Sequence, residues 1–598
     1  MEKTVDILNA KMSEAFEKAG LDKSYGRVNL SNRPDLCEYQ CNGAMALAKI
    51  MHKKPIEIAE SVVEILKGEP AFKKAEAVMP GFINLDISED FLAGYLADMD
   101  SNEGLGLEPV AKDGEKAPVI IIDYGGANVA KPLHVGHLRS AVIGESIKRL
   151  GARMGNKMIG DVHLGDWGLQ MGLIIEELKD RDQTEFDLSD LEEIYPAASA
   201  KSKEKGEDGK LTERAEKFKE RALKATEKLQ SGDPECTKIW KRIMELSLAD
   251  LKKNYDSLNV SFELWKGESD VQKYIPDMLK DFEDRGIAYE SQGALVVDIA
   301  EETDTKELPP CIVRKSDGAS LYATTDLATM VERELLYKPD AYIYIADQRQ
   351  SLHYTSFFRV ARKAGIVRDD ESLTFLGFGT MNGKDGKPFK TREGGVLRLS
   401  ALVNEINEKV YEKIRENRST DEISDEEAKS IAETVGLAAL KYGDLSNQAS
   451  KDYIFDIDRF TSFEGNTGPY ILYSIVRISS ILKKYAEGTS ASESASVPES
   501  RETFAAAVSE SKASKALSLL LSRYNEVISL AWKELAPHKI CQYIYEISDA
   551  FNSFYHETKI LSEEDEEKKR SYIALLSLTR KVLTDCIDIL GFKAPEKM

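Results

Sequence analysis

The chain contains little cysteine and no long apolar run, which argues against a disulfide-rich, zinc-binding or membrane-spanning protein. Only 6 of the 598 residues are cysteine, and only Cys37 and Cys41 lie close together. No histidine or second cysteine pair completes a zinc-ligand pattern, so we expect reduced thiols of a cytoplasmic protein and no bound metal. Because no run reaches about 18 apolar residues, no membrane span is predicted. The first residues also lack the basic and apolar pattern of a signal peptide.

Positively charged residues are outnumbered by negatively charged ones. The sequence has 81 Lys and Arg against 103 Asp and Glu, which gives a net charge of −22 at pH 7. A nonspecific DNA coat carries a basic surface, so this balance argues against one. It does not exclude a large enzyme that meets RNA through local basic patches, because net charge describes only the far field. With 42% hydrophobic and 31% charged residues, the chain is typical of globular proteins, and its length suggests three or four domains of about 150 residues.

Hydrophobic periodicity divides the chain into three predicted domains. Residues 1–110 combine helical patterns with an alternating strand pattern, which indicates a small α+β domain. Residues 111–410 alternate strands with helices, which indicates an α/β domain with a parallel sheet. Residues 411–598 show almost only helical patterns, which indicates a helical bundle, with a flexible loop at 489–500.

The central domain is predicted to carry a helical insertion. Strand patterns at 117–122, 294–299, 341–345 and 373–377 are assigned to one sheet. The highly charged stretch at about 176–290 interrupts them with helical patterns. A solvated helical insertion explains this stretch better than a binding arm, because residues 201–228 are mostly Lys, Glu, Arg, Ala and short polar residues.

The most informative stretch is His134-Val135-Gly136-His137, which follows the apolar strand pattern and precedes a helical one. A strand, a short loop and a helix start can place a phosphate against free backbone N–H groups. The two histidines are three residues apart and share one face of the first helical turn. Two imidazole donors there can stabilise charge that develops on phosphorus.

The loop before the histidines carries further polar groups at the expected carboxyl end of a strand. Gly125 and Gly126 permit close backbone approach. Asp123 and Asn128 are predicted to face the crevice in which α/β sheets bind ligands, and Lys131 adds a cation. Asp123 could instead cap a loop or helix, but its position beside the histidines favours ligand contact.

A glycine-bounded cationic loop at 383–395 follows the last strand pattern. Its cations are Lys384, Lys387, Lys390 and Arg392. Such a loop suits a charge clamp on a transferring or leaving phosphate. An exposed basic hairpin is the alternative.

Two further segments carry candidate binding residues, one within a helical pattern and one just after a strand pattern. Tyr322 and Asp326 are four residues apart and share a helix face; an aromatic face with a carboxylate suits a guanidinium. Taken alone, an N-cap role with Tyr322 packed in the core is the stronger alternative. Gln350 and His353 lie in a segment just after another strand pattern, and His353 is equally well explained as a structural histidine.

Together these stretches resemble class I aminoacyl-tRNA synthetases, and specifically the arginyl-tRNA synthetase family. The resemblance rests on ANVAKPLHVGHLRS at 127–140 and DVHLGDWGLQ at 161–170. It covers nearly the whole chain, because further matches lie in the predicted terminal domains, at 33–49, 80–84, 465–470, 549–555 and 594–598. It implies a Rossmann-type catalytic domain, an N-terminal tRNA-binding domain and a C-terminal anticodon-binding domain.

The resemblance also implies roles for the candidate residues. His134, Gly136 and His137 would bind the ATP phosphates, with Mg²⁺ arriving on ATP. Asn128 and Gln350 would hold the backbone groups of the amino acid. The positions that surround the substrate guanidinium would be Asp123, Tyr322 and Asp326. A guanidinium has five donors and demands carboxylates, so lysine and citrulline would be rejected by leaving those carboxylates unpaired.

The late loop departs from the Lys-Met-Ser-Lys motif that many class I enzymes carry. It reads KPFKTR at 387–392, so either Lys387 or Lys390 could meet the phosphates. Family members without that motif resemble this chain in carrying a lysine at the position of Lys131, which we expect to compensate.

The predicted function is ATP-dependent ligation of L-arginine to tRNA(Arg) through arginyl-adenylate, by a monomer that requires tRNA for the first step. No second hydrolytic site is recognisable, so editing is not predicted. One rival is a cysteinyl-type synthetase, which would need a zinc cluster that the sequence lacks. The other is a noncatalytic tRNA-binding paralogue, which we would expect to have lost His134, His137 or the pair Asp123 and Asp326.

Overall fold

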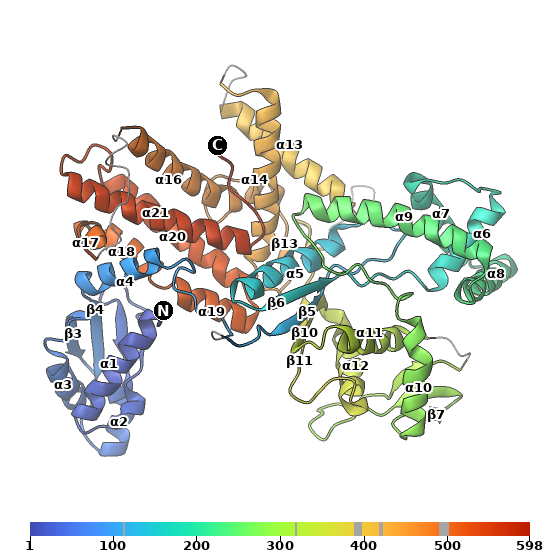
Figure 1. Cartoon of the computed structure of the whole chain (residues 1–598), viewed down its shortest axis with the longest axis horizontal. Coiled ribbons are helices and arrows are strands. Elements are labelled where there is room, and N and C mark those ends of the chain that lie inside the picture. The colour runs from blue at the N-terminus through green and yellow to red at the C-terminus, as the bar shows by residue number, and fades with distance from the viewer. Residues whose placement is uncertain (112–113, 317–319, 388–396, 418–421, 489–500) are drawn as a thin grey trace. The chain divides into compact units, whose positions relative to one another are not determined.

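The computed structural model describes residues 1–111, 114–316, 320–387, 397–417, 422–488 and 501–598. They divide into two compact units (Figure 1). The first unit holds Met1–Pro109 with Ser462–Ile589 and Lys593–Met598, and the second holds Val110–Thr461 with Leu590–Phe592. Among these described ranges, no helix is long and apolar enough to cross a membrane.

The N-terminal part of the first unit is an α+β fold, as predicted. An antiparallel sheet has the order β1-β2-β4-β3, with β1 (Val28–Leu30), β2 (Tyr39–Cys41), β3 (Phe72–Val78) and β4 (Phe82–Ile87). In β4, Ile83, Leu85 and Ile87 are fully buried, because alternate residues of a strand face the same side. The helices are α1 (Thr4–Lys18), α2 (Gly43–Met51), α3 (Pro55–Leu66) and α4 (Glu89–Ser101).

The C-terminal part of the first unit is helical, which also agrees with the prediction. Its helices are α16 (Gly468–Gly488), α17 (Arg501–Glu510), α18 (Lys512–Leu521), α19 (Tyr524–Glu534), α20 (Pro537–Glu557) and α21 (Glu566–Ile589). In α20, Ile540, Ile544, Ile547 and Phe551 are fully buried, at the three- and four-residue spacing of an amphipathic helix. The loop predicted at 489–500 lies outside the described residues.

A parallel sheet with the order β11-β10-β5-β6 forms the centre of the second unit. Its strands are β5 (Val119–Asp123), β6 (Lys157–Asp161), β10 (Ala341–Asp347) and β11 (Ser372–Phe378), and helices α5 (Val135–Arg153), α11 (Tyr322–Leu336) and α12 (Ser351–Ala364) connect them (Figure 1). The apolar residues of β5 are buried on both faces, as expected of a central parallel strand. The chain passes from β5 to β6 on one side, and β10 lies on the other. The crevice at their carboxyl ends is therefore a topological switch point.

The strand pattern at 294–299 was assigned to this sheet, and that assignment is wrong. Residues Ala294–Val297 form β8 of a separate antiparallel sheet, with β7 (Tyr289–Ser291) and β9 (Cys311–Arg314). The turn from β7 to β8 contains Gln292 and Gly293, both with positive φ. Two such residues make a tight hairpin turn, which pairs a strand with its neighbour along the chain.

A helical insertion separates β6 from the later strands, as predicted. It contains α6 (Leu169–Asp180), α7 (Leu188–Lys201), α8 (Glu213–Gln230) and α9 (Pro234–Ser257), followed by α10 (Ile275–Asp284). Its small core includes Leu173, Ala198, Phe218 and Ala222. Many of its charged groups form ion pairs, such as Arg221 with Asp180 at 2.8 Å, which fits a solvated insertion.

The last part of the second unit packs against α5. It contains β12 (Met381–Asn382), α13 (Leu399–Asn417), α14 (Asp425–Leu445), β13 (Tyr453–Ile454) and α15 (Ile457–Phe460). Arg139 of α5 is buried and donates to Asp444 of α14 at 3.1 Å and to the carbonyl of Gly379 at 2.6 Å. Helix α13 spans the proposed domain boundary near residue 410, and the compact unit continues to Thr461.

Candidate active site

The two histidines close the first turn of α5, at the carboxyl end of β5. His134 is the N-cap residue, and its Nδ1 accepts from the backbone N–H of Gly136 at 3.0 Å. Nδ1 of His137 accepts from the backbone N–H of His134 at 3.2 Å. The rings lie 4.0 Å apart between centroids. The histidines thus form a reciprocal capping box in place of the usual hydroxyl and carboxylate.

This arrangement fixes which ring nitrogen of each histidine can reach a ligand. Because Nδ1 accepts in both rings, the proton of each neutral imidazole lies on Nε2. Burial, then the neighbouring His134 and Lys131, lower the pKa of His137 to about 3. Burial and Lys131 also lower the pKa of His134. Both rings are therefore neutral Nε2–H donors at neutral pH.

The expectation of free backbone N–H groups at this helix start is not met. The N–H of Val135 donates to the carbonyl of Leu397 at 3.1 Å, and the N–H of His137 donates to the carbonyl of His134 at 2.8 Å. The N–H of Gly136 is taken by the imidazole of His134. The first three N–H groups of α5 are thus already bonded, and the imidazoles are the donors left for a phosphate.

At two positions in the site, glycine leaves the space that a neighbouring side chain occupies. A Cβ on Gly136 would lie 2.7 Å from Cε1 of His134, so the ring position requires glycine. A Cβ on Gly165 would lie 2.1 Å from Oδ1 of Asn128, which is exposed in the loop after β5. The backbone of this loop pairs with Gly165, because Val129 donates to its carbonyl at 3.2 Å.

The residues that follow the cationic loop along the chain pair with the histidine turn. Leu399 donates to the carbonyl of Leu133 at 2.9 Å, and Arg398 opposes His134 in an antiparallel bridge. At the near end, Lys384 pairs with Asp456 at 3.1 Å. The structure describes Lys387, whose N–H donates to Asp385 at 3.1 Å, but Lys390 lies outside the described residues.

Tyr322 and Asp326 lie on the first two turns of α11. The N-cap of α11 is Leu321, and Tyr322 is 70% exposed, so neither the capping role nor the core position applies. Asp326 bonds to Nε2 of His353 at 2.6 Å, which joins His353 to a predicted site residue. Gln350 is exposed in a short 3-10 turn (Gln348–Gln350) directly after β10.

Asp123 is held by a guanidinium of the protein itself. Arg333 of α11 donates to Asp123 and to Asp161, each at 2.6 Å, and to the hydroxyl of Tyr344 at 2.9 Å. Although burial works against its charge, Tyr344, Asp123 and Asp161 hold the pKa of Arg333 well above its usual value. Any contact of Asp123 with a substrate is therefore shared with Arg333.

Sequence reasoning missed Glu268 and His163, which interact electrostatically with each other, and Glu268 also does so with Asp326. Burial raises the pKa of Glu268 to about 7; His163 opposes the shift, and Asp166 and Asp326 add to it. Glu268 also contributes to the raised pKa of Tyr322, after burial. Both ring nitrogens of His163 are buried without a hydrogen-bond partner. His163 lay within a quoted motif, but no periodicity or spacing marks Glu268, which enters through a backbone contact with Leu164.

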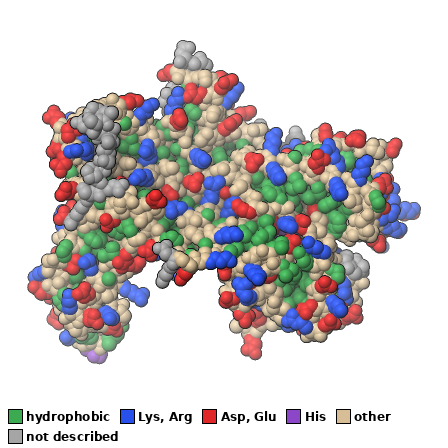
Figure 2. All heavy atoms as spheres, in the orientation of Figure 1, with side chains coloured by type: hydrophobic (Ala, Val, Ile, Leu, Met, Phe, Trp, Pro, Cys, Tyr) green, Lys and Arg blue, Asp and Glu red, His purple; other side chains and the backbone are tan. Residues whose placement is uncertain are grey.

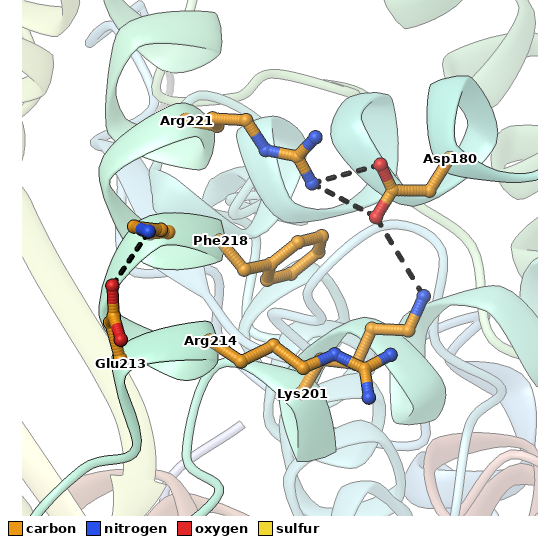
Figure 3. Close-up of a pocket in the computed structure, with 7 residues that line it drawn as sticks. Asp180, Lys201, Glu213, Arg214, Phe218 and Arg221 are labelled. Atoms are coloured by element: carbon orange, nitrogen blue, oxygen red, sulfur yellow. Dashed lines mark hydrogen bonds and ion pairs between the residues drawn. The ribbon is translucent and has the colours of Figure 1, made fainter.

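A cavity of about 460 Å³ lies elsewhere, on the helical insertion (Figure 3). It is lined by Asp180, Lys201, Glu213, Arg214, Lys217, Phe218 and Arg221. Arg221 and Lys217 are already ion-paired there, and none of the predicted site residues lines it. In the part of the chain that the structure describes, no cluster of His, Cys, Asp and Glu side chains could hold a metal ion.

The first unit presents a second candidate surface, which we call the aromatic–arginine surface: Tyr470, Tyr473, Arg477, Asn552 and Tyr555. The guanidinium of Arg477 lies 4.5 Å from the ring centroid of Tyr473 and 5.1 Å from that of Tyr555. Asn552 donates to the hydroxyl of Tyr470 at 2.8 Å. Stacked rings, a guanidinium and an amide suit an unpaired nucleobase. Elsewhere, Lys and Arg are interspersed with Asp and Glu over the face in Figure 2.

Comparison with known proteins agrees with this geometry. Residues 106–457 match the family "tRNA synthetases class I (R), catalytic domain", so the second unit carries the catalytic core of a class I aminoacyl-tRNA synthetase. Residues 471–598 match the "DALR anticodon binding domain", and residues 6–87 match the "Arginyl tRNA synthetase N terminal domain".

Relatives match over the full length. Arginine–tRNA ligases of Agathobacter rectalis and Alkaliphilus oremlandii are 55% and 50% identical, with 100% of both chains covered. The chain therefore belongs to the arginyl-tRNA synthetase family. The arginyl-tRNA synthetase structure from Plasmodium falciparum has the same fold, with a TM-score of 0.80 at 24% identity and 100% coverage of both chains.

Proposed function

We propose that the chain ligates L-arginine to tRNA(Arg) in two steps, using ATP. The observation that carries the proposal is the pair of neutral imidazoles at the first turn of α5, in the same compact unit as Tyr322 and Asp326 on the first turns of α11. The first group suits a phosphate and the second suits a guanidinium. The full-length likeness to arginine–tRNA ligases supports the same reaction.

In the first step, a carboxylate oxygen of arginine attacks the α-phosphorus of ATP. A new P–O bond forms, the bond to the bridging oxygen breaks, and pyrophosphate leaves with its electron pair. The Nε2–H groups of His134 and His137 donate to phosphate oxygens that gain charge, and Lys131 adds a cation. No protein nucleophile is needed, because positioning and electrostatics supply the catalysis.

Selection of arginine would rest on carboxylates that only a guanidinium satisfies. Asp326 and Glu268 lie near Tyr322 and can accept from the planar fork of the side chain. Citrulline has the same shape but no charge, so it would leave Glu268 without a cationic partner. Asn128 and Gln350 remain our candidates for the α-amino and carboxylate groups.

In the second step, a hydroxyl of the terminal adenosine of tRNA attacks the acyl carbon of arginyl-adenylate and AMP leaves. We assign anticodon contact to the aromatic–arginine surface, because exposed rings beside a guanidinium can stack and hydrogen-bond unpaired bases. The match of residues 471–598 to an anticodon-binding domain supports this assignment.

The proposal also covers the metal ion, the cellular compartment, the oligomeric state and the tRNA requirement. Mg²⁺ would enter as part of the nucleotide substrate. All six cysteines are free and buried, which supports work in the reducing cytoplasm. A monomeric state and a tRNA requirement for activation stay predictions from the family resemblance.

Arginine-dependent exchange of labelled pyrophosphate into ATP, with and without tRNA(Arg), tests the proposal. Exchange that needs arginine, and that lysine or citrulline does not replace, is expected. Exchange that occurs only when tRNA is present would show in addition that activation of arginine requires tRNA. Binding of tRNA without exchange in either case would instead favour the noncatalytic tRNA-binding paralogue.

A further inference from the structure

Tyr195, on the insertion helix α7, contacts the lysine that we place at the phosphates. Nζ of Lys131 lies 4.6 Å from the centroid of the Tyr195 ring. At this distance the negative face of an aromatic ring attracts an ammonium group. A helix of the insertion, more than 60 residues away along the chain, thus reaches into the loop that precedes the histidines.

A ring suits this lysine better than a carboxylate would. A carboxylate would neutralise the ammonium and repel an approaching phosphate. An aromatic ring orients the ammonium through its quadrupole and leaves the full positive charge available. The lysine stem is also restrained, so less rotamer freedom is lost when the phosphate binds.

The position of Tyr195 is fixed by the packing of α7. Leu191, Ile194 and Ala198 are fully buried, so they set the rotation of the helix about its axis. Glu192, one turn before Tyr195, pairs with Arg398 at 2.7 Å. Since Arg398 opposes the histidine turn, α7 contacts both chain segments that frame the phosphate site.

Lys131 links Tyr195 to the histidine turn, because burial and then Lys131 lower the pKa of His134.

We propose that Tyr195 is a positioning residue for amino-acid activation, whose ring holds the Lys131 ammonium beside His134 and His137. The inference rests on the proposed function, because Lys131 acts on the ATP phosphates there. Tyr195 itself touches no reacting atom. Its contribution is to keep the cation in place during transfer.

Three variants test this role in the pyrophosphate exchange assay with tRNA present. Tyr195→Leu removes the ring at similar bulk, and we expect kcat to fall by about 2- to 30-fold, with the KM for arginine unchanged. Tyr195→Phe keeps the ring and should retain kcat within about twofold. In the background of Lys131→Met, Tyr195→Leu should cause no further loss, because coupled residues are not additive.

Phe218→Leu is a matched control for the insertion. Phe218 of α8 also carries cations over its ring, with Lys201 at 5.7 Å and Arg221 at 5.5 Å, and Figure 3 shows it between them. It lies outside the predicted site, so any loss there reports only packing of the insertion. Circular dichroism and the thermal midpoint of each variant show whether the fold is retained.

The outcomes separate this inference from the proposed function. If the unmodified chain shows no arginine-dependent exchange, the proposed function fails. If it does exchange, the role of Tyr195 is overturned by normal kcat in Tyr195→Leu, by equal losses in Tyr195→Phe and Tyr195→Leu, or by additive losses with Lys131→Met.

Discussion

Arginine binding should release a proton near neutral pH, because of Glu268. Burial raises the pKa of this carboxyl to about 7, with His163 acting against the shift and Asp166 and Asp326 adding to it. A bound guanidinium favours the ionised carboxylate. The protonated fraction must therefore lose its proton before arginine binds well, and binding weakens as pH falls through the pKa.

The expected magnitude follows from linkage. If arginine binds only the ionised form, a pKa of about 7 raises the apparent Kd about 11-fold at pH 6, about twofold at pH 7 and by about a tenth at pH 8. At pH 7, about half a proton should leave for each arginine bound. Calorimetric titrations with arginine in buffers of different ionisation enthalpy measure both quantities.

Glu268→Gln should remove this pH dependence and weaken binding at every pH. Loss of one charge-assisted hydrogen bond costs about 1.5–3 kcal/mol, or about 10- to 150-fold in Kd. The KM for ATP over the same pH range serves as the internal control. If Glu268→Gln keeps the tenfold trend between pH 6 and pH 8, a group other than Glu268 causes the pH dependence. A flat profile in the unmodified chain would refute the reasoning altogether.

Three further predictions concern separate parts of the chain. Gly136→Ala should lower kcat for exchange at least about tenfold at unchanged KM for arginine, because the added Cβ would lie 2.7 Å from the His134 ring. Gly488→Ala is the control, because a Cβ added there would meet no atom within 4 Å. Arg477→Gln should raise the KM for tRNA about tenfold without changing the Kd for arginine, and an unchanged KM would reject the assigned anticodon surface. Burial lowers the pKa of Lys441 to about 7, so its contribution to stability improves as pH rises from about 7 towards 10. Lys441→Met should therefore show its largest gain in thermal midpoint at and below pH 7, and a gain that instead grows with pH would contradict this sign.

The histidine turn could be predicted from sequence because its contacts are local. The partners of His134 and His137 lie within three residues, so spacing alone placed them on one face of a helix start. The use of the first N–H groups could not be predicted, because Val135 donates to Leu397. That partner lies beyond the whole insertion and the strands β6 to β12 along the chain, outside the range of any periodicity.

The assignment of strands to sheets also succeeded for some strands and failed for another. Continuous apolar runs such as that of β5 mark a strand buried on both faces, and β5, β10 and β11 were found on that basis. A short run at 294–299 has the same appearance, but its partners were decided by a two-residue turn with positive φ. Turn geometry therefore outweighed strand pattern, as it does in hairpins.

The contact of Arg333 with Asp123 explains how one helix can serve two parts of the site. Asp161, Asp123 and Tyr344 stand opposite one another on three adjacent strands, and Arg333 binds all three. This fixes α11 against the carboxyl edge of the sheet. Because a helix rises about 1.5 Å per residue, Tyr322 at the other end of α11 lies about 16 Å from Arg333. The carboxylates at the sheet edge already have a guanidinium, so we expect the substrate guanidinium to bind mainly at the first turns of α11 and at Glu268.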